Sequence, residues 1–357
     1  MVNQDLVAKI NAIENTYRLM KDFAPVAGEV LLRTQSHVQN IGKDNEQLVK
    51  DGEDPSGTYL TVLDGLIQDA FLYRLNLVNP EARINVEEKT ELRKLFRGNS
   101  AEICTVHLDP LDGTKSYTKG QPEFSTGYAI SNSDNNFTHT VVYVPAQHLI
   151  YVASPDEHKI LCVTVTPNQE LGDLVADIKK LQEVNKSLEE SIDSLREDMI
   201  QKIASLALEV DAEETSPAIK PEKPIYEKRV LSDKGKEALK QMGYEISSMH
   251  CAHMRVLEVA LGQATAYLYG LTNPHDSMIP YAFAAKCGAV LVDVNGKPIS
   301  GRDMKLTVED GIARFERLPS VVYLSAHAVG NGHMEKILAI LKKPENLNQE
   351  YWGKPKP

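Results

Sequence analysis

The most informative segment of this chain is His107-Leu108-Asp109-Pro110-Leu111-Asp112-Gly113-Thr114. Apolar residues at 103–106 are typical of a strand, and two carboxylates, Asp109 and Asp112, follow where that strand ends. Pro110 stiffens the turn between them, and the Leu111 carbonyl joins the same group of oxygens. Hard oxygen ligands of this kind suit Mg²⁺. A bare pair of aspartates three residues apart is common by chance, but the full segment after a strand is not, so it predicts a magnesium site.

The two residues after this pair indicate what the metal would act on. Gly113 and Thr114 place backbone N–H groups at the expected start of a helix. The first N–H groups of a helix have no partner within the helix and attract anions such as phosphate. We therefore expect a phosphate group to bind at this turn.

Composition excludes several other classes of protein. The chain has 357 residues, 42% of them hydrophobic, with a net charge of −11 and a pI near 5.5. An acidic protein of this size can bury a large core but lacks the basic surface that nucleic-acid polymers and anionic membranes need. The four cysteines show no disulfide or zinc spacing, and neither a signal peptide nor an 18-residue apolar run is visible. We expect a cytoplasmic protein.

Periodicity outlines the remaining elements of an α+β fold. Strands in series followed by helices favour a mixed or layered plan over strict βαβ repetition. The pattern predicts helices over 2–49 (with Pro25 starting a second helix), from Tyr59 or Asp64 to Leu77, and over 236–241, 255–268, 278–287 and 332–341, and strands over 103–107, 125–130, 138–144, 148–153 and 289–294.

The segment 167–225 differs from the rest of the chain. From Leu171, apolar residues step by three and four through Met199, with one Asn at a heptad a position, the pattern of a two-stranded parallel coiled coil. The same stripe would equally let a helix over 171–202 pack on its own domain or fold back as a hairpin. The charged, proline-containing run from Glu213 to Pro224 is typical of a tether.

In several segments, the chain resembles the inositol monophosphatase superfamily. Besides the Asp-Pro-Leu-Asp-Gly-Thr signature, four further segments match in the expected order: Thr61–Asp64, Ile84–Glu88, Ala260–Tyr267 with His275-Asp276, and Cys287–Asp293. The resemblance covers about residues 1–165 and 230–345. It implies a layered αβαβα sandwich, with an αβ half over 1–166, an inserted coiled coil and tether over 167–225, and a second αβ half over 226–357.

The resemblance also implies a site and a reaction, the Mg²⁺-dependent hydrolysis of a phosphomonoester with two or three ions per site. The metal ligands would be Glu87, Asp109, the Leu111 carbonyl, Asp112 and Asp276. Glu87 and Thr114 would orient the attacking water with Asp64 behind the Thr114 hydroxyl, and Gly113 and Thr114 would bind phosphate. By the same resemblance, we expect inhibition by lithium and a homodimer, formed through the coiled coil or through other contacts.

Several of these residues have ordinary alternative roles. Glu87 with Glu88 could be a solvated pair, and Asp276 and Asp64 could each serve only as a helix cap. His107, His250 and His253 are expected to be structural or surface groups, because this chemistry asks for oxygen ligands. The chain departs from the family with His275 where Trp is usual, His250 where Gly is usual and Thr265 where Asp is usual.

The substrate is left open between two classes. Lys115–Gly120 and Pro280 resemble the bisphosphate-nucleotidase branch, so 3'-phosphoadenosine 5'-phosphate and inositol phosphates stand close together. We expect substrate contacts from Lys115, Ser116, His250 and Arg255. The alternative to an enzyme is a scaffold or regulatory protein that keeps the fold and recruits a partner through its coiled coil.

Overall fold

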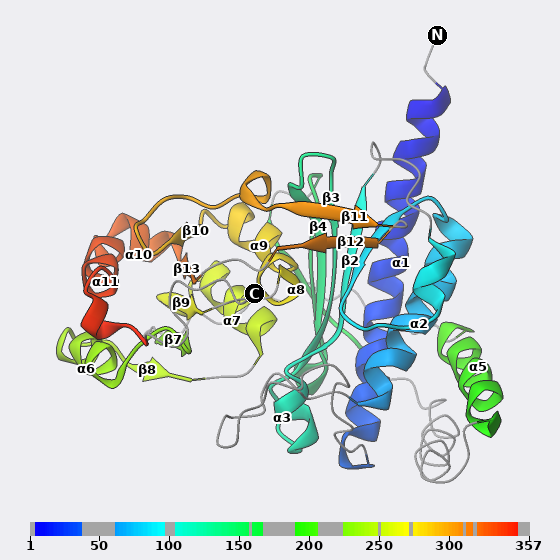
Figure 1. Cartoon of the computed structure of the whole chain (residues 1–357), viewed down its shortest axis with the longest axis horizontal. Helices are drawn as coiled ribbons and strands as arrows, with labels where there is room; N and C mark the ends of the chain where they lie inside the picture. Colours follow the sequence, from blue (N-terminus) through cyan, green and yellow to red (C-terminus); the bar gives the residue numbers. More distant parts are fainter. Residues whose placement is uncertain are drawn as a thin grey trace.

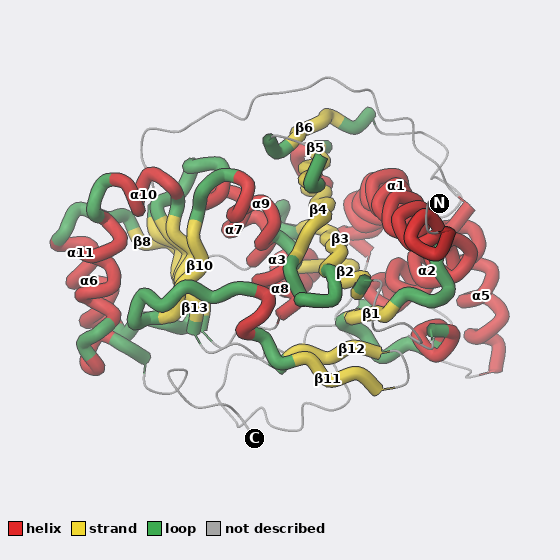
Figure 2. Tube along the Cα trace, turned by 90° about the horizontal axis from the view of Figure 1, so that it is seen from above, coloured by secondary structure: helices red, strands yellow, loops and turns green. Residues whose placement is uncertain are grey.

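The computed structural model of this chain describes residues 4–37, 61–96, 104–156, 159–166, 190–205, 224–248, 251–270, 274–309, 312–316 and 320–348. Within these ranges, helices and two mixed β-sheets alternate in five layers, in the order helix, sheet, helix, sheet, helix (Figure 2). The α+β fold and its layered plan, which the sequence predicted, are confirmed.

The larger sheet has eight strands and carries the Asp-Pro-Leu-Asp segment near its middle. Its order is β11-β12-β1-β2-β3-β4-β5-β6. β1 is parallel to both β2 and β12, and the other neighbours are antiparallel. The strands are β1 (Arg83–Val86), β2 (Thr105–Asp112), β3 (Ser125–Ser131), β4 (Phe137–Val144), β5 (Leu149–Ala153), β6 (Leu161–Thr164), β11 (Leu306–Glu309) and β12 (Ile312–Phe315).

Helices α1 (Gln4–Thr34) and α2 (Val62–Val78) cover one face of this sheet (Figure 1). Their apolar side chains meet the sheet around three fully buried rings, those of Phe23, Phe71 and Tyr128. The ring centroids lie 4.7 Å apart for Phe71 and Tyr128 and 5.6 Å apart for Phe23 and Phe71. Truncating one such ring to alanine typically costs about 3–5 kcal/mol. These contacts fix the helical layer against the strands that carry the acidic segment.

The expectation that Pro25 starts a second helix is wrong, because α1 runs through it without a break. An internal proline costs about 3 kcal/mol in an isolated helix. Here its neighbours Phe23 and Val26 are fully buried against the sheet, so tertiary packing offsets that cost. Gly28 then brings the helix close to β4, since a Cβ at this position would lie 2.1 Å from Cδ1 of Tyr143.

The described part of the segment 167–225 packs on this same helical layer and does not project from the body. Helix α5 (Glu190–Ser205) lies against α2 and contacts α1. Its side chains Met199 and Ile203 are buried in the core of the first sheet. For these residues the second alternative, packing of the stripe on its own domain, is the one observed. The remainder of the predicted coiled coil and the tether, at 167–189 and 206–223, lie outside the described residues.

The middle layer consists of short helices shared between the two sheets. It holds α7 (Ala252–Ala260), α8 (Pro274–Met278) and α9 (Tyr281–Lys286). α7, α8 and α9 contact β3, β2 and β4 of the first sheet, and α7 and α9 also contact strands of the second. These helices therefore lie between the two sheets, and the acidic site, to which they contribute, lies there as well.

The second sheet and the outer layer complete the fold. The sheet order is β10-β13-β9-β7-β8, formed by β10 (Val290–Asp293), β13 (Val321–Leu324), β9 (Ala266–Tyr269), β7 (Ile225–Lys228) and β8 (Ile246–Ser247). The outer layer holds α6 (Asp233–Gln241), α10 (Ala326–Gly330) and α11 (His333–Leu341), and the short helix α3 (Thr114–Thr118) follows β2. Single 3-10 turns lie at Gln35–His37, Leu92–Leu95, Pro145–Gln147, Gly301–Asp303 and Pro344–Asn346.

The strands predicted after the acidic segment agree with β3 to β5, and the predicted last helix agrees with α11. The strand predicted over 103–107 is too short, because β2 continues to Asp112 and the two aspartates lie within it. The helix expected over 255–268 is wrong in its second half, because α7 ends at Ala260 and Ala266–Tyr269 forms β9. Gly262, at φ +70, lies in the left-handed region just past the helix, a conformation that commonly ends one. The helix expected over 278–287 is observed as α9, which begins after its N-cap residue Pro280, while Met278 is the last residue of α8. Among the helices of the described ranges, none combines the length and the apolar character needed to cross a bilayer.

Candidate active site

The parallel pairing of β1 and β2 brings Glu87 beside Asp109. Val86 pairs with Leu108, so the residues that follow them, Glu87 and Asp109, lie next to each other. Glu87 is half-buried and hydrogen-bonds to the Asp109 carboxyl group. The turn after β1 is held from α2, where the Gln68 side chain donates to the Glu88 carbonyl at 2.8 Å and accepts from the Glu88 N–H at 2.9 Å. Glu87 and Glu88 are therefore not an exposed, solvated pair.

A bulge in β2 gathers the two aspartates of the signature. Asp109 pairs with Gly127 and Asp112 with Ser125, so three steps along β2 match two along β3. The extra residue bends the strand around Pro110. Asp109 Oδ1 accepts the Leu111 N–H at 3.1 Å, which fixes the carboxylate in the turn. Both aspartates are buried, at 1% and 5% exposure.

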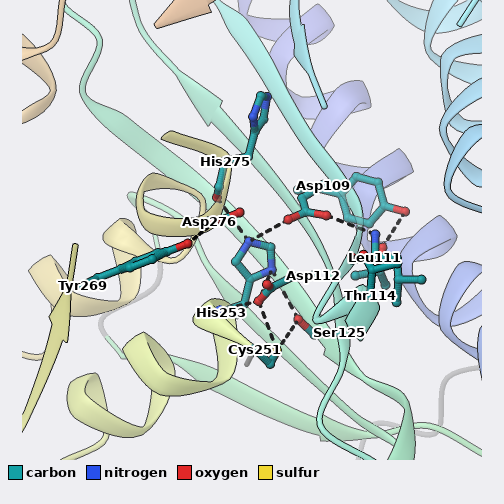
Figure 3. A network of polar contacts seen from close by, with 12 residues as sticks. Asp109, Leu111, Asp112, Thr114, Ser125, Cys251, His253, Tyr269, His275 and Asp276 are labelled. Carbon is teal, nitrogen blue, oxygen red and sulfur yellow. Dashed lines mark hydrogen bonds and ion pairs between the residues drawn. The ribbon is translucent and has the colours of Figure 1, made fainter. Parts of the chain in front are cut away.

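Asp276 approaches these two carboxylates from helix α8. One oxygen each of Asp109, Asp112 and Asp276 lies within 4.8 Å of the others, a spacing that a single metal ion can bridge. The Tyr269 hydroxyl on β9 donates to Asp276 Oδ2, as Figure 3 shows, and Lys228 Nζ donates to the Tyr269 hydroxyl at 3.0 Å. Asp276 is the third residue of α8 and lies inside the helix rather than at its cap position.

The N-terminus of α7 supports Asp112. Its Oδ2 accepts the His253 backbone N–H at 2.7 Å and the Cys251 thiol at 3.1 Å. The positive end of a helix dipole stabilises a carboxylate placed this way. Donors from the middle layer therefore hold a side chain that belongs to the first sheet.

The electrostatics of the cluster favour a bound cation. Burial raises the pKa of Asp109 well above its usual range, and the negative charges of Glu87, Asp112 and Asp276 raise it further. The pKa of Asp276 is also raised, chiefly by burial, against the opposing effect of Lys228. Like charges this close repel unless a cation lies between them. A group of carboxylate oxygens at this spacing fits a hard divalent ion such as Mg²⁺.

The turn at the end of β2 adopts a conformation that requires glycine. Gly113 has φ +88, and a Cβ here would lie 2.6 Å from the Glu123 carbonyl oxygen. The chain then enters α3, and the Thr114 hydroxyl donates to the Leu111 carbonyl at 2.9 Å. Leu111 and Thr114, the predicted ligand and the predicted water-orienting residue, are thus in direct contact.

Asp64 caps helix α2. Its Oδ2 accepts the Thr61 N–H at 2.8 Å and the Thr61 hydroxyl at 2.6 Å, and Thr61 caps the helix reciprocally through Leu63. The capping role that the sequence allowed for Asp64 is therefore present. Whether it also supports the Thr114 hydroxyl stays a prediction.

The four residues expected to contact substrate lie in different settings. Lys115 and Ser116 lie in the first turn of α3, half-buried and 1% exposed respectively. His250 is outside the described residues. Arg255 is 2% exposed on α7, where its guanidinium pairs with Glu258 at 2.5 Å and stacks 4.5 Å above the Tyr226 ring. Its observed contacts are thus with the protein itself.

Sequence patterns did not indicate which residues of the middle layer and the second sheet surround the carboxylates. Cys251, Tyr269 and Lys228 belong to no motif and become neighbours of Asp112 and Asp276 only through folding. His253 was expected to be a structural or surface group. It is fully buried, and its ring lies between the carboxylates of Asp109 and Asp112 (Figure 3).

Comparison with known proteins agrees with this geometry. Residues 14–323 match the model of the inositol monophosphatase family. No curated protein sequence matches the chain significantly. Among solved structures, an IMPase from Thermotoga maritima superposes with a TM-score of 0.57 at 13% identity and covers 93% of this chain and 96% of its own.

Two further solved structures carry informative ligands. An IMPase/NADP phosphatase complexed with Mg²⁺ and phosphate has a TM-score of 0.55 at 17% identity, over 90% of this chain and 92% of its own. Staphylococcal inositol monophosphatase-1, in an inhibitory complex soaked with LiCl, has a TM-score of 0.55 at 17% identity, over 90% and 91%. At these identities the structures establish the fold, while the family match spans most of the sequence. The chain therefore belongs to the inositol monophosphatase family and is a metal-dependent phosphoric monoester hydrolase.

Proposed function

We propose that this enzyme hydrolyses a small phosphorylated metabolite, 3'-phosphoadenosine 5'-phosphate or an inositol phosphate, with Mg²⁺ as its metal. The proposal rests on one carboxylate oxygen each of Asp109, Asp112 and Asp276, which lie within 4.8 Å of one another. Glu87 is hydrogen-bonded to Asp109 beside them. A related IMPase/NADP phosphatase holds Mg²⁺ and phosphate together, which supports the choice of ion. Two or three ions per site would be held by these four side chains and the Leu111 carbonyl.

Bound Mg²⁺ would supply the activation of the attacking water and the stabilisation of the leaving oxygen. The protein's own groups then have separate tasks. Glu87, beside Asp109 at the sheet edge, would accept a proton from the water, and Thr114 would orient that water through its hydroxyl, whose proton is directed at the Leu111 carbonyl. Asp64 would act behind Thr114, in addition to capping α2.

The phosphate would lie at the start of α3. The amides of Gly113 and Thr114 are the first of that short helix. Gly113 adopts a left-handed conformation and, as a glycine, has no Cβ beside the backbone. Close approach of a phosphate oxygen to these amides would position the ester relative to the carboxylates. Lys115, half-buried in the same turn, would add a positive charge.

The substrate class rests on the residues after the signature. Lys115–Gly120 resembles the bisphosphate-nucleotidase branch, which favours a nucleotide carrying a phosphomonoester. The NADP phosphatase activity named for a structural neighbour adds NADP to the substrates that deserve a test. Ser116, His250 and Arg255 are proposed to shape the substrate pocket, with Arg255 acting through its contacts to Glu258 and Tyr226.

The experiment is phosphate release in Mg²⁺ from a panel of 3'-phosphoadenosine 5'-phosphate, inositol 1-phosphate, inositol 1,4-bisphosphate, fructose 1,6-bisphosphate and NADP. Each substrate is assayed with and without lithium and with Asp109→Asn. The matched control is Asp134→Asn, which neutralises an exposed aspartate paired with Arg302. We expect lithium-sensitive release from one substrate class, lost only in Asp109→Asn. Equal release from Asp109→Asn and the wild type would contradict the site.

The oligomeric state is a separate proposal. A homodimer through the heptad stripe would need residues of 171–189, because α5 already buries Met199 and Ile203 against its own domain. Light scattering of the full chain and of a variant lacking 171–189 tests this. A dimeric mass that is halved by the deletion is expected. An unchanged mass would assign any dimer contact to another surface.

A further inference from the structure

Side chains from three surrounding elements hold the backbone of α8, the helix that carries Asp276. α8 has five residues, so its C=O groups find few partners within the helix. Three carbonyls in and just after α8 accept hydrogen bonds from side chains of other elements, namely His253 on α7, Tyr323 on β13 and Thr140 on β4. The bond from His253 goes to the carbonyl of residue 275, directly before Asp276, and measures 3.2 Å.

The chemistry of this contact makes His253 Nε2 a hydrogen-bond donor. A carbonyl oxygen can only accept, so the proton between the two atoms belongs to the imidazole. Nδ1 lies 3.3 Å from the Ser125 hydroxyl, which can donate to it. Nε2 lies 3.8 Å from Asp109 Oδ2 and Nδ1 lies 3.8 Å from Asp112 Oδ2, and both separations are too long for a hydrogen bond. The ring therefore bonds to the scaffold around the carboxylates and not to the carboxylates themselves.

The backbone of the same residue holds a second carboxylate. The His253 N–H donates to Asp112 Oδ2 at 2.7 Å. Through its backbone and its ring, His253 thus connects Asp112 of the first sheet with the residue before Asp276 on α8. Asp112 and Asp276 each contribute one oxygen to the group that lies within 4.8 Å. His253 therefore spans the two elements whose carboxylates must meet around one ion.

Tight packing keeps the ring in this position. His253 is 0% exposed, and a Cβ at Gly127 on β3 would lie 2.4 Å from its Cε1 and 2.6 Å from its Nδ1. Figure 3 shows the ring between Asp109 and Asp112, in contact with the backbone of His275. Because a close-packed ring has little room to turn, its donor stays directed at α8.

We propose that His253 is a positioning residue, which donates its Nε2–H to the His275 carbonyl and so holds Asp276 at the distance from Asp112 that a shared divalent ion requires. This inference rests on the proposed function, because it concerns the same metal site. Hydrogen bonds outside the ligand set orient the ligands and set the affinity for the metal. Loss of this bond should therefore weaken metal binding although every carboxylate is still present.

Calorimetric titration of the metal-free, full-length protein with Mg²⁺ tests this with a matched pair of variants. His253→Met fills a similar space without an N–H and should bind Mg²⁺ about 10–100-fold more weakly than the wild type. His253→Gln places an amide N–H near the position of Nε2 and should recover most of that loss. The control is Thr140→Val, which removes the donor to the carbonyl three residues beyond Asp276 and should leave the affinity unchanged.

Nitrogen NMR of the metal-free wild type, labelled with ¹⁵N-histidine, gives a readout that needs no variant. The His253 ring, assigned through bonds from its backbone, should carry a proton on Nε2, and this proton should exchange slowly with water. An Nε2 without a proton would overturn the proposal. Circular dichroism checks that the variants fold. If His253→Met does not fold, the NMR result decides alone.

Wild-type affinity for Mg²⁺ in folded His253→Met would overturn the proposal. Equal losses in both His253 variants would overturn it as well, because they would assign the effect to packing against Gly127. Failure of the proposed function looks different. Phosphate release by the wild type with unchanged affinity in His253→Met refutes only the positioning role. A loss of affinity that His253→Gln recovers, without release from any substrate of the panel by the wild type, refutes the proposed function and keeps the positioning role.

Discussion

The strand side and the helix side of the acidic site hold their carboxylates by different means. On the strand side, Glu87 and Asp109 are placed by the register of β1 and β2, and the bulge around Pro110 turns Asp112 toward them. On the helix side, Asp276 depends on the hydroxyl of Tyr269, and donors from α7 support Asp112. Sheet register cannot change without disturbing neighbouring strands, whereas a side-chain donor can be exchanged alone. Substitutions on the strand side should therefore abolish the site, and those on the helix side should tune it.

The largest loss of activity is expected on the strand side, from Gly113→Ala. The added Cβ would meet the Glu123 carbonyl at 2.6 Å with φ at +88, so the turn between β2 and α3 must shift. A displacement of about 1 Å at a catalytic turn can reduce the rate by about a hundredfold. Phosphate release measures this loss.

Gly120→Ala is the control for Gly113→Ala. Gly120 also has a positive φ, of +71, but a Cβ there meets no atom within 4 Å. It should lower the free energy of unfolding by about 1 kcal/mol through backbone strain and leave the rate close to that of the wild type. Equal losses of activity in the two variants would show that the position of the turn does not matter to catalysis.

A smaller effect, on the affinity for Mg²⁺, is expected on the helix side, from Tyr269→Phe. This change removes the hydroxyl that donates to Asp276 and links it to Lys228 while keeping the ring. Outer donors of this kind typically change metal affinity by about 10–100-fold. Calorimetric titration with Mg²⁺ should show a weaker affinity near the lower end of that range. A loss of all measurable binding would mean that the helix side is as indispensable as the strand side.

The smallest effect on the site is expected from His139, which belongs to neither side. Burial lowers its pKa to about 4, with Lys286 and Lys21 adding to the effect and Asp156 opposing it. Between pH 4 and 6.5 the unfolded chain binds a proton that the folded protein does not, so this residue makes stability fall as the pH falls through that window. The size is about 1–3 kcal/mol.

His139→Gln tests this contribution of His139 to the pH dependence of stability. The variant should lose less stability than the wild type between pH 6.5 and 4 in urea unfolding, with an unchanged affinity for Mg²⁺ at pH 7.5. An identical pH dependence in the two proteins would mean that His139 titrates normally in the folded state.

The sequence motif predicted that Asp109 and Asp112 lie together, because they are close in sequence, whereas Glu87 was expected only through the family resemblance. Asp109, Asp112 and the glycine turn lie within one segment, and a single parallel pairing adds Glu87. The same methods missed the return of β11 and β12 to the edge of the first sheet. These strands have four residues each. β12 pairs with β1, which lies more than 200 residues earlier in the sequence, and β11 pairs with β12. Local sequence patterns carry no information about contacts at that range.

The helix side and α5 show two other limits of prediction from sequence patterns. Nothing in a sequence of Cys251-Ala252-His253 indicates that a backbone N–H and a ring will meet carboxylates from another strand. For α5, the apolar stripe is the same whether the helix pairs with a second copy or packs on its own domain. Only the position of α2 settles that Met199 and Ile203 are buried there.

The buried aspartates are proposed to form a site for divalent cations. The most direct test is thermal unfolding of the wild type and of Asp109→Asn in EDTA and in increasing Mg²⁺. Without metal, Asp109→Asn should be the more stable of the two, because it removes one of several repelling charges. Mg²⁺ at about 100 times its Kd should stabilise the wild type by about 2.7 kcal/mol and the variant far less. Equal stabilisation of both proteins, or none of the wild type, would show that the aspartates do not form a cation site.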